Sequence, residues 1–151
     1  ALMMLVAFIL SVIQLVLGTQ VRQAVDAAGF ATDGGQEAGW ASQLGWVFLV
    51  HRSFSWLVLA SHLLLAVALW RRFPGGGVMR GLALAAFLLP LALMLIGIGL
   101  AEWGLHPVLQ PFHLWLGFVL VSLDGLFFLL ILRSRSFHRM PVSKPSLTPT
   151  S

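Results

Sequence analysis

The chain has no cysteine among its 151 residues, which excludes disulfide bonds, thiolate metal sites and the covalent haem attachment of c-type cytochromes. Charged residues are also scarce: they make up 9% of the sequence, against roughly 25% in a typical soluble domain. Hydrophobic residues make up 59%, which is more than a soluble protein of this size could hide from water. The composition therefore predicts an integral membrane protein whose solvent is lipid.

The net charge of +4 does not indicate a nucleic-acid partner. The nine Lys and Arg residues lie between apolar segments and in the C-terminal tail, where they orient membrane helices and form no phosphate-binding patch. The chain opens with Ala1-Leu2-Met3-Met4 and no basic lead-in, which is unlike a cleaved secretory signal. This opening suggests a piece of a longer polypeptide.

Four apolar segments are long enough to cross a bilayer core of about 30 Å, which takes roughly 20 residues. We expect the spans to cover residues 1–18, 44–70, 81–101 and 112–132. Pro111 begins the last span at a first-turn position that helices tolerate. The sequence predicts an all-α, four-transmembrane-helix bundle over residues 1–133, followed by a basic, disordered cytoplasmic tail over residues 134–151.

The distribution of basic residues predicts the orientation of the bundle. Seven of the nine fall on the side of the middle connection and the tail: Arg71, Arg72, Arg80, Arg133, Arg135, Arg139 and Lys144. Basic residues mark the cytoplasmic face, so both chain ends are expected inside (N-in/C-in). The second and fourth spans then run in the same direction, from outside to inside.

The second and fourth spans also share a pattern of polar residues. His113 follows His51 by 62 residues, and an arginine stands 20 residues after each histidine, at Arg71 and Arg133. Two helix hairpins of the same plan form an internal repeat of the sort that transport and haem-carrying bundles use. The matched spacing places the two histidines at equal depth in the membrane.

Equal depth and equal direction give these histidines a chemical interpretation. Two parallel helices, diagonal in a four-helix bundle, can aim imidazoles at one point, as a bis-histidine haem requires. A single histidine near an interface is more often a residue that bonds its own helix, but a matched pair favours a ligand role. Zinc or non-haem iron would need further protein ligands, and His106 in the outer loop is the only other nitrogen candidate nearby.

A second polar layer follows 11 residues below the first, at His62 and Asp124. Eleven residues are close to three helical turns, with a rise of about 16.5 Å, so each residue lies beneath its histidine on the same helix face. A lone aspartate near the bilayer midplane costs about 2.5 to 3.5 kcal/mol, so it needs a partner or a proton. His62 is the expected partner, and the alternative is that each side chain bonds its own helix or the nearby Ser61 and Ser122.

Three segments resemble the heme A synthase family of membrane oxidases: Leu17-Gly18-Thr19-Gln20-Val21-Arg22, His51-Arg52-Ser53-Phe54-Ser55-Trp56 and Phe112-His113-Leu114. That family is built of two four-helix halves, each with a histidine on its second and fourth helix. The resemblance covers about residues 5 to 133 and implies oxidation of a methyl group of heme O to the formyl group of heme A, for terminal oxidases.

The resemblance is to the C-terminal half of that family. The N-terminal, substrate-processing half has a glutamate three residues before the helix-two histidine and commonly a cysteine pair in an outer loop. Here that position is Phe48, and cysteine is absent. The C-terminal half holds a haem b that relays electrons, so His51 and His113 are implied as its axial ligands. No catalytic acid or base carries over, since Glu37 stands too far back in the loop.

These observations leave three hypotheses for the function. The first is the haem b electron-relay half of a heme A synthase, joined to an N-terminal four-helix half or a homologous partner subunit in a bacterial plasma (inner) membrane. The second is a non-catalytic haem-binding or structural subunit of a respiratory oxidase complex. The third is a b-type cytochrome that exchanges electrons with quinone.

Other residues near the histidines have a plain and a specific interpretation. Arg22 and Arg52 stand near the outer level of the expected haem and could pair with its propionates, or could simply anchor the helices at the interface. Trp56 and Trp115 could pack against the porphyrin, although ordinary packing is the simpler role. Four further tryptophans fall near expected membrane interfaces, where tryptophan is common: Trp40, Trp46, Trp70 and Trp103.

Overall fold

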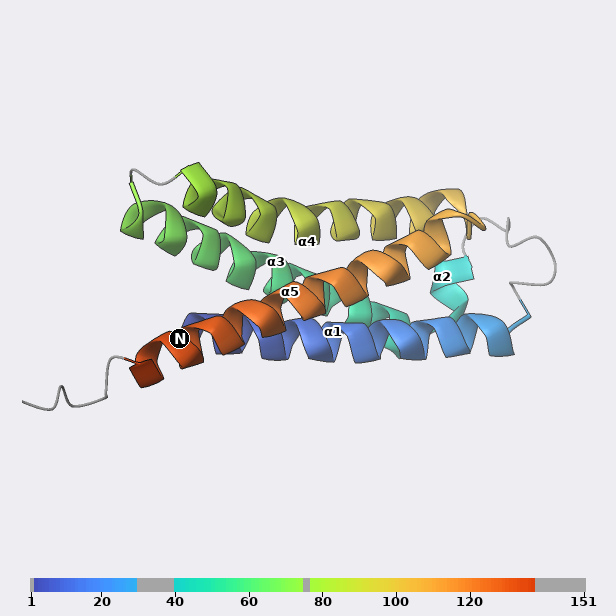
Figure 1. Ribbon diagram of the computed structural model, residues 1–151. Coiled ribbons are helices and arrows are strands. Elements are labelled where there is room, and N and C mark those ends of the chain that lie inside the picture. The colour runs from blue at the N-terminus through green and yellow to red at the C-terminus, as the bar shows by residue number, and fades with distance from the viewer. Residues whose placement is uncertain (1, 30–39, 75–76, 138–151) are drawn as a thin grey trace, which may run out of the picture.

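A computed structural model describes residues 2–29, 40–74 and 77–137 of the chain (Figure 1). The described residues form five helices: α1 (Leu2–Ala27), α2 (Trp40–Gln43), α3 (Trp46–Arg72), α4 (Gly77–Trp103) and α5 (Leu109–Phe137). Four of them are long and apolar enough to cross a membrane, and α2 is a single turn in the connection between α1 and α3. The protein is an all-α, multi-pass membrane bundle, as its composition predicts.

The outer surface of the bundle is apolar, as a lipid solvent requires. Most of its large hydrophobic side chains point outward, and among the described residues only ten hydrophobic ones are buried. Trp46 and Trp103 lie exposed at one end of the bundle, and Trp70 lies exposed at the other. These positions match the two aromatic belts of a membrane protein.

The four long helices form a closed ring of neighbours. The α1 helix packs against α3 and α5, and α4 packs against α3 and α5 as well, so α3 and α5 stand on a diagonal. The beginning of α1, the connection from α3 to α4 and the end of α5 all lie at the same end of the bundle (Figure 1). The diagonal placement of the two histidine-bearing helices agrees with the sequence prediction.

The helix boundaries differ from the expected spans, and the differences are largest at the ends of α1 and α5. The α1 helix continues nine residues past Gly18, because Arg22 and Asp26 form an i,i+4 ion pair there and Val25 packs against Leu105. The α5 helix continues to Phe137, past the expected boundary at residue 133. The rest of the expected tail, residues 138–151, lies outside the described residues.

Apolar clusters close both ends of the bundle interior. At the end that holds the chain termini, Met4, Ala7 and Leu65 are buried, and Phe127 and Phe128 pack against them. At the other end, a second cluster joins the outer connections to the helices: Val25 and Leu105, with Val21, Ala41, Leu44 and Phe48 packed around them. The polar side chains of the interior lie between these clusters.

Candidate functional site

His51 and His113 each turn toward a glycine on the preceding long helix. A Cβ built on Gly18 of α1 would lie 3.3 Å from Cε1 of His51 and 3.8 Å from its Nδ1. A Cβ built on Gly97 of α4 would lie 3.4 Å from Cε1 of His113 and 3.9 Å from its Nε2. Both hairpins therefore repeat one device, in which a glycine on the first helix makes room for an imidazole on the second.

The two imidazoles are half-buried and leave hydrogen-bonding capacity unused. Nδ1 of His51 and Nδ1 of His113 are both buried without a hydrogen-bond partner. A buried polar atom without a partner costs about 1 to 3 kcal/mol, and the described residues leave one such atom on each ring.

Gln14 of α1 lies beside His51 in this upper polar layer. Its side-chain Nε2 donates to the backbone carbonyl of His51 at 3.2 Å, while its Oε1 is buried and has no partner. Gln14 and Gly18 are one helical turn apart on α1, and both contact His51. The sequence interpretation did not include Gln14, although it is one of only two polar residues in the apolar part of the first span.

The donor set fits a haem better than a bare metal ion. Within the described ranges, no group of three or more His, Asp or Glu side chains is placed to hold a metal ion, whereas a structural zinc site has four ligands. Two imidazoles on diagonal helices, with no third ligand, match the two axial positions of a low-spin haem. His106 lies exposed in the outer connection, where its Nδ1 accepts from the backbone N–H of Val108 at 3.3 Å.

The lower polar layer confirms the expected pairing of His62 and Asp124. His62 Nε2 lies 3.2 Å from Oδ2 and 3.4 Å from Oδ1 of Asp124, and the His62 side chain is fully buried. His62 Nδ1 lies 2.8 Å from the carbonyl oxygen of Val58, which can only accept, so Nδ1 carries a proton. The remaining contact needs one proton shared between Nε2 and the carboxyl group, and in either arrangement the pair is neutral overall.

Ser11 of α1 completes this layer and was not predicted from the sequence. Its Oγ donates to Oδ2 of Asp124 at 2.7 Å, across 113 residues of chain. The buried carboxyl group thereby joins three helices, α1, α3 and α5. Ser122, which the sequence offered as an alternative partner, is exposed, whereas Ser61 lies 3.3 Å from His62 Nδ1 and donates to the Val58 carbonyl.

Arg22 and Arg52 stand at the outer end of the bundle, as expected, but both are exposed. Arg22 pairs with Asp26 at 2.7 Å and also donates to the side chain of Gln110, which links α1 to the beginning of α5. Ser55 Oγ donates to the backbone carbonyl of Arg52. The contacts of Arg22 are those of an interface anchor, and a propionate role for either arginine stays a prediction.

Trp56 and Trp115 do not lie between the helices. Their exposed fractions are 61% and 59%, and Trp115 stacks on Phe112 with ring centroids 6.0 Å apart. Both rings are largely exposed on the surface of the bundle. Ordinary packing, the simpler of the two interpretations, agrees with the stacking on Phe112, and packing against a porphyrin stays a prediction.

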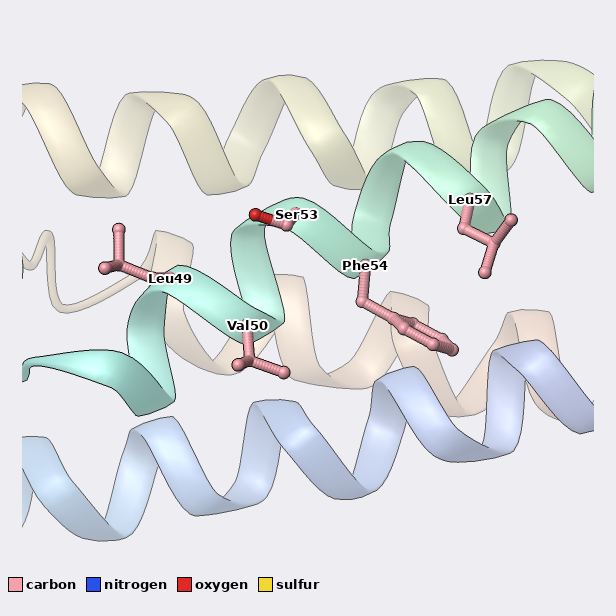
Figure 2. A pocket seen from close by; sticks show the side chains of 5 residues that line it. All are labelled: Leu49, Val50, Ser53, Phe54 and Leu57. Carbon is pink, nitrogen blue, oxygen red and sulfur yellow. The ribbon is translucent and has the colours of Figure 1, made fainter.

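A shallow groove on the outer face of α3 lies at the level of His51. It is lined by Leu49, Val50, Ser53, Phe54 and Leu57. In Figure 2, Val50 and Phe54 extend to the side of α3 on which α1 lies. The groove does not include either histidine, so it is separate from the interior layers.

Comparison of the chain with family models, with curated proteins and with solved structures finds no match. The resemblance to the heme A synthase family therefore stays a prediction.

Proposed function

We propose that this protein binds one haem b between α3 and α5, with His51 and His113 as its axial ligands. The observation that carries this proposal is the pair of half-buried imidazoles on diagonal helices, each with a buried Nδ1 that has no hydrogen-bond partner and each lying against a glycine of the neighbouring helix. A haem bound there supplies one-electron transfer at a fixed position in the membrane. The protein's own residues hold it, orient it and exclude water from it.

The apolar clusters at the two ends of the bundle support a relay function. They lie on either side of the histidine layer and would limit the access of water to a bound haem. In the described ranges the one buried carboxyl group is that of Asp124, and it belongs to the lower layer. The histidine layer therefore has no buried carboxylate among the described residues. This arrangement favours an electron-relay bundle over an independent catalytic centre.

The resemblance to the C-terminal half of heme A synthase gives the relay a specific setting. In that setting the chain works with an N-terminal four-helix half or a homologous partner in a bacterial plasma membrane, with the α3–α4 connection in the cytoplasm. The partner half oxidises heme O to heme A for a terminal oxidase, and this chain transfers the electrons. Coexpression of the two halves and chromatography of the extracted haems would test the setting through the ratio of heme A to heme O.

Absorption spectroscopy of the purified protein tests the haem site itself. In detergent, the protein should give a low-spin b-type spectrum, because two imidazoles fill both axial positions. His51→Ala and His113→Ala should each give a high-spin spectrum or a haem-free protein, whereas His106→Ala should keep the wild-type spectrum. An unchanged low-spin spectrum in both axial variants would refute the ligand assignment.

The groove on α3 favours a second candidate, a b-type cytochrome that exchanges electrons with quinone. Its five lining residues flank His51 in sequence, and it opens to the lipid, where quinones dissolve. Reduction of the haem by a short-chain quinol would support this candidate. Ser53→Leu and Leu57→Trp would fill the groove and should slow that reduction, whereas an unchanged rate in both variants would exclude the groove as a quinone site.

A further inference from the structure

The side-chain amide of Gln14 has a bonded nitrogen and an oxygen without a partner, and the nitrogen bonds the backbone of His51. Its amide nitrogen donates to the His51 carbonyl at 3.2 Å, which holds the side chain on the seam between α1 and α3. Its Oε1 is buried and unpartnered, and so is Nδ1 of His51. The first of these atoms is a hydrogen-bond acceptor, and the second becomes a donor when Nε2 of the same ring carries a metal.

The orientation of the His51 ring turns its Nδ1 toward α1, the helix that carries Gln14. The Cε1–Nδ1 edge of the ring faces α1, where a Cβ on Gly18 would lie 3.3 Å and 3.8 Å from those atoms. Gln14 stands one turn before Gly18 on α1. The Nδ1 edge of His51 therefore faces the helix that carries the unused acceptor, and Nε2 is the nitrogen farther from Gly18.

We infer that Gln14 is a positioning residue for the axial ligand, and that its Oε1 accepts the Nδ1–H of His51 when His51 Nε2 binds the haem iron. This inference rests on the proposed haem function. Metal-bound histidines almost always donate their other ring N–H to an acceptor, which fixes the tautomer and the ring orientation and makes the imidazole a stronger electron donor. A stronger donor stabilises ferric iron and so lowers the midpoint potential of the haem.

The second hairpin has no residue equivalent to Gln14, so the two proposed axial ligands differ in their surroundings. The position on α4 that corresponds to Gln14, four residues before Gly97, is Leu93. The ring of His113 presents its Cε1–Nε2 edge to α4, and its buried Nδ1 has no partner. His51 is therefore the ligand whose basicity the protein sets, and His113 is the ligand that it holds by packing.

Spectroelectrochemical titration of the purified holoprotein tests the inference, with three variants compared with the wild type. Gln14→Leu removes the acceptor and should raise the midpoint potential, while Gln14→Glu provides a stronger acceptor and should lower it. Leu93→Met is the matched control at the corresponding place on α4 and should leave the potential unchanged. All three should keep a low-spin spectrum, and the ferric electron paramagnetic resonance signal should shift only in the two Gln14 variants.

The possible results separate the inference from the proposed function. A wild-type protein that binds no haem overturns both, and this is known before any variant is made. Wild-type haem with the same potential in Gln14→Leu, or a shift in the same direction in both Gln14 variants, overturns the inference alone. If Gln14→Leu does not retain haem, Gln14→Met replaces it, because its unbranched side chain has similar length without a strong acceptor, and the same increase in potential is expected.

Discussion

The contact between His62 and Asp124 predicts a measurable energetic coupling, which a double-mutant cycle with His62→Leu and Asp124→Leu would determine. Leucine is close to histidine in size and larger than aspartate, so the cycle removes polar contacts and leaves little empty volume. His62→Leu leaves the Asp124 carboxyl with the Ser11 hydroxyl as its remaining bonded partner in the described residues. An aspartate without a partner near the midplane costs about 2.5 to 3.5 kcal/mol, and Ser11 offsets part of this, so we expect a loss of about 2 kcal/mol.

Asp124→Leu should be less costly. His62 loses the partner of Nε2 but keeps the bond from Nδ1 to the Val58 carbonyl, and Ser11 can turn to a carbonyl of its own helix. We expect a loss of about 1 kcal/mol, in the range measured for polar contacts between membrane helices, which average about 0.6 and reach about 1.7 kcal/mol. The double variant has an apolar layer with neither group unpartnered and should lose about 1 kcal/mol. The coupling energy is then about 2 kcal/mol.

The assay is reversible unfolding of the protein in mixed micelles, titrated with a denaturing detergent and followed by circular dichroism. A matched control cycle pairs His62→Leu with Ser122→Ala, since Ser122 is an exposed serine on the same helix as Asp124. This control cycle should be additive within about 0.5 kcal/mol, as expected for residues that do not touch. If the cycle with Asp124 were additive within the same limit, the two side chains would not form the contact described here.

Three further predictions follow from the same structure. Gly18→Leu should abolish haem binding, because its side chain would occupy the place of the His51 ring. Gly81→Leu is the control and should bind haem normally, since nothing lies within 4 Å of a Cβ built on Gly81. The absorbance ratio of haem to protein measures both. Single cysteines at His106 and Gly77, both exposed and at opposite ends of the bundle, should react with a membrane-impermeant maleimide from outside and from inside respectively, and labelling of both in intact cells would refute the four-span topology. Arg22→Gln should change the free energy of unfolding by less than about 1 kcal/mol, because its ion pair with Asp26 is exposed, and a larger loss in the detergent titration would mean that Arg22 has a buried partner.

The pairing of His62 with Asp124 could be predicted from the sequence, because each residue lies on the same helix as one of the two upper histidines. His51 and His62, like His113 and Asp124, are related by an eleven-residue step whose geometry is fixed by the helix itself. Depth followed from the matched spacing to Arg71 and Arg133. Once α3 and α5 stand on a diagonal, these constraints are sufficient to bring His62 to Asp124, and the contact at 3.2 Å agrees with them.

The contribution of α1 could not be predicted in the same way. Ser11, Gln14 and Gly18 lie on one face, at the three- and four-residue steps of a helix, so the sequence contains the stripe. The rotation of α1 about its axis depends, however, on packing against α3 and α5, and that packing is set by contacts over long sequence separations. The ends of α1 and α5 were missed for a related reason, because hydropathy reports where lipid ends and not where backbone hydrogen bonding stops.

The two polar layers differ in symmetry, and the chemistry of each accounts for the difference. The upper layer repeats a glycine and a histidine in each hairpin, as the proposed binding of one group between two histidine ligands requires. The lower layer sets an imidazole opposite a carboxyl group, because a shared proton needs two different partners, of which one can donate to the other. The asymmetry extends to α1 and α4, the first helix of each hairpin. Seven residues before Gly18 is Ser11, which donates to Asp124. Seven residues before Gly97 is Pro90, which is buried and has no hydrogen to donate. Among the described residues, the first hairpin therefore provides the serine that donates to the carboxyl group of Asp124, which lies on the second hairpin. The lower layer thus joins the two hairpins to each other beneath the histidines.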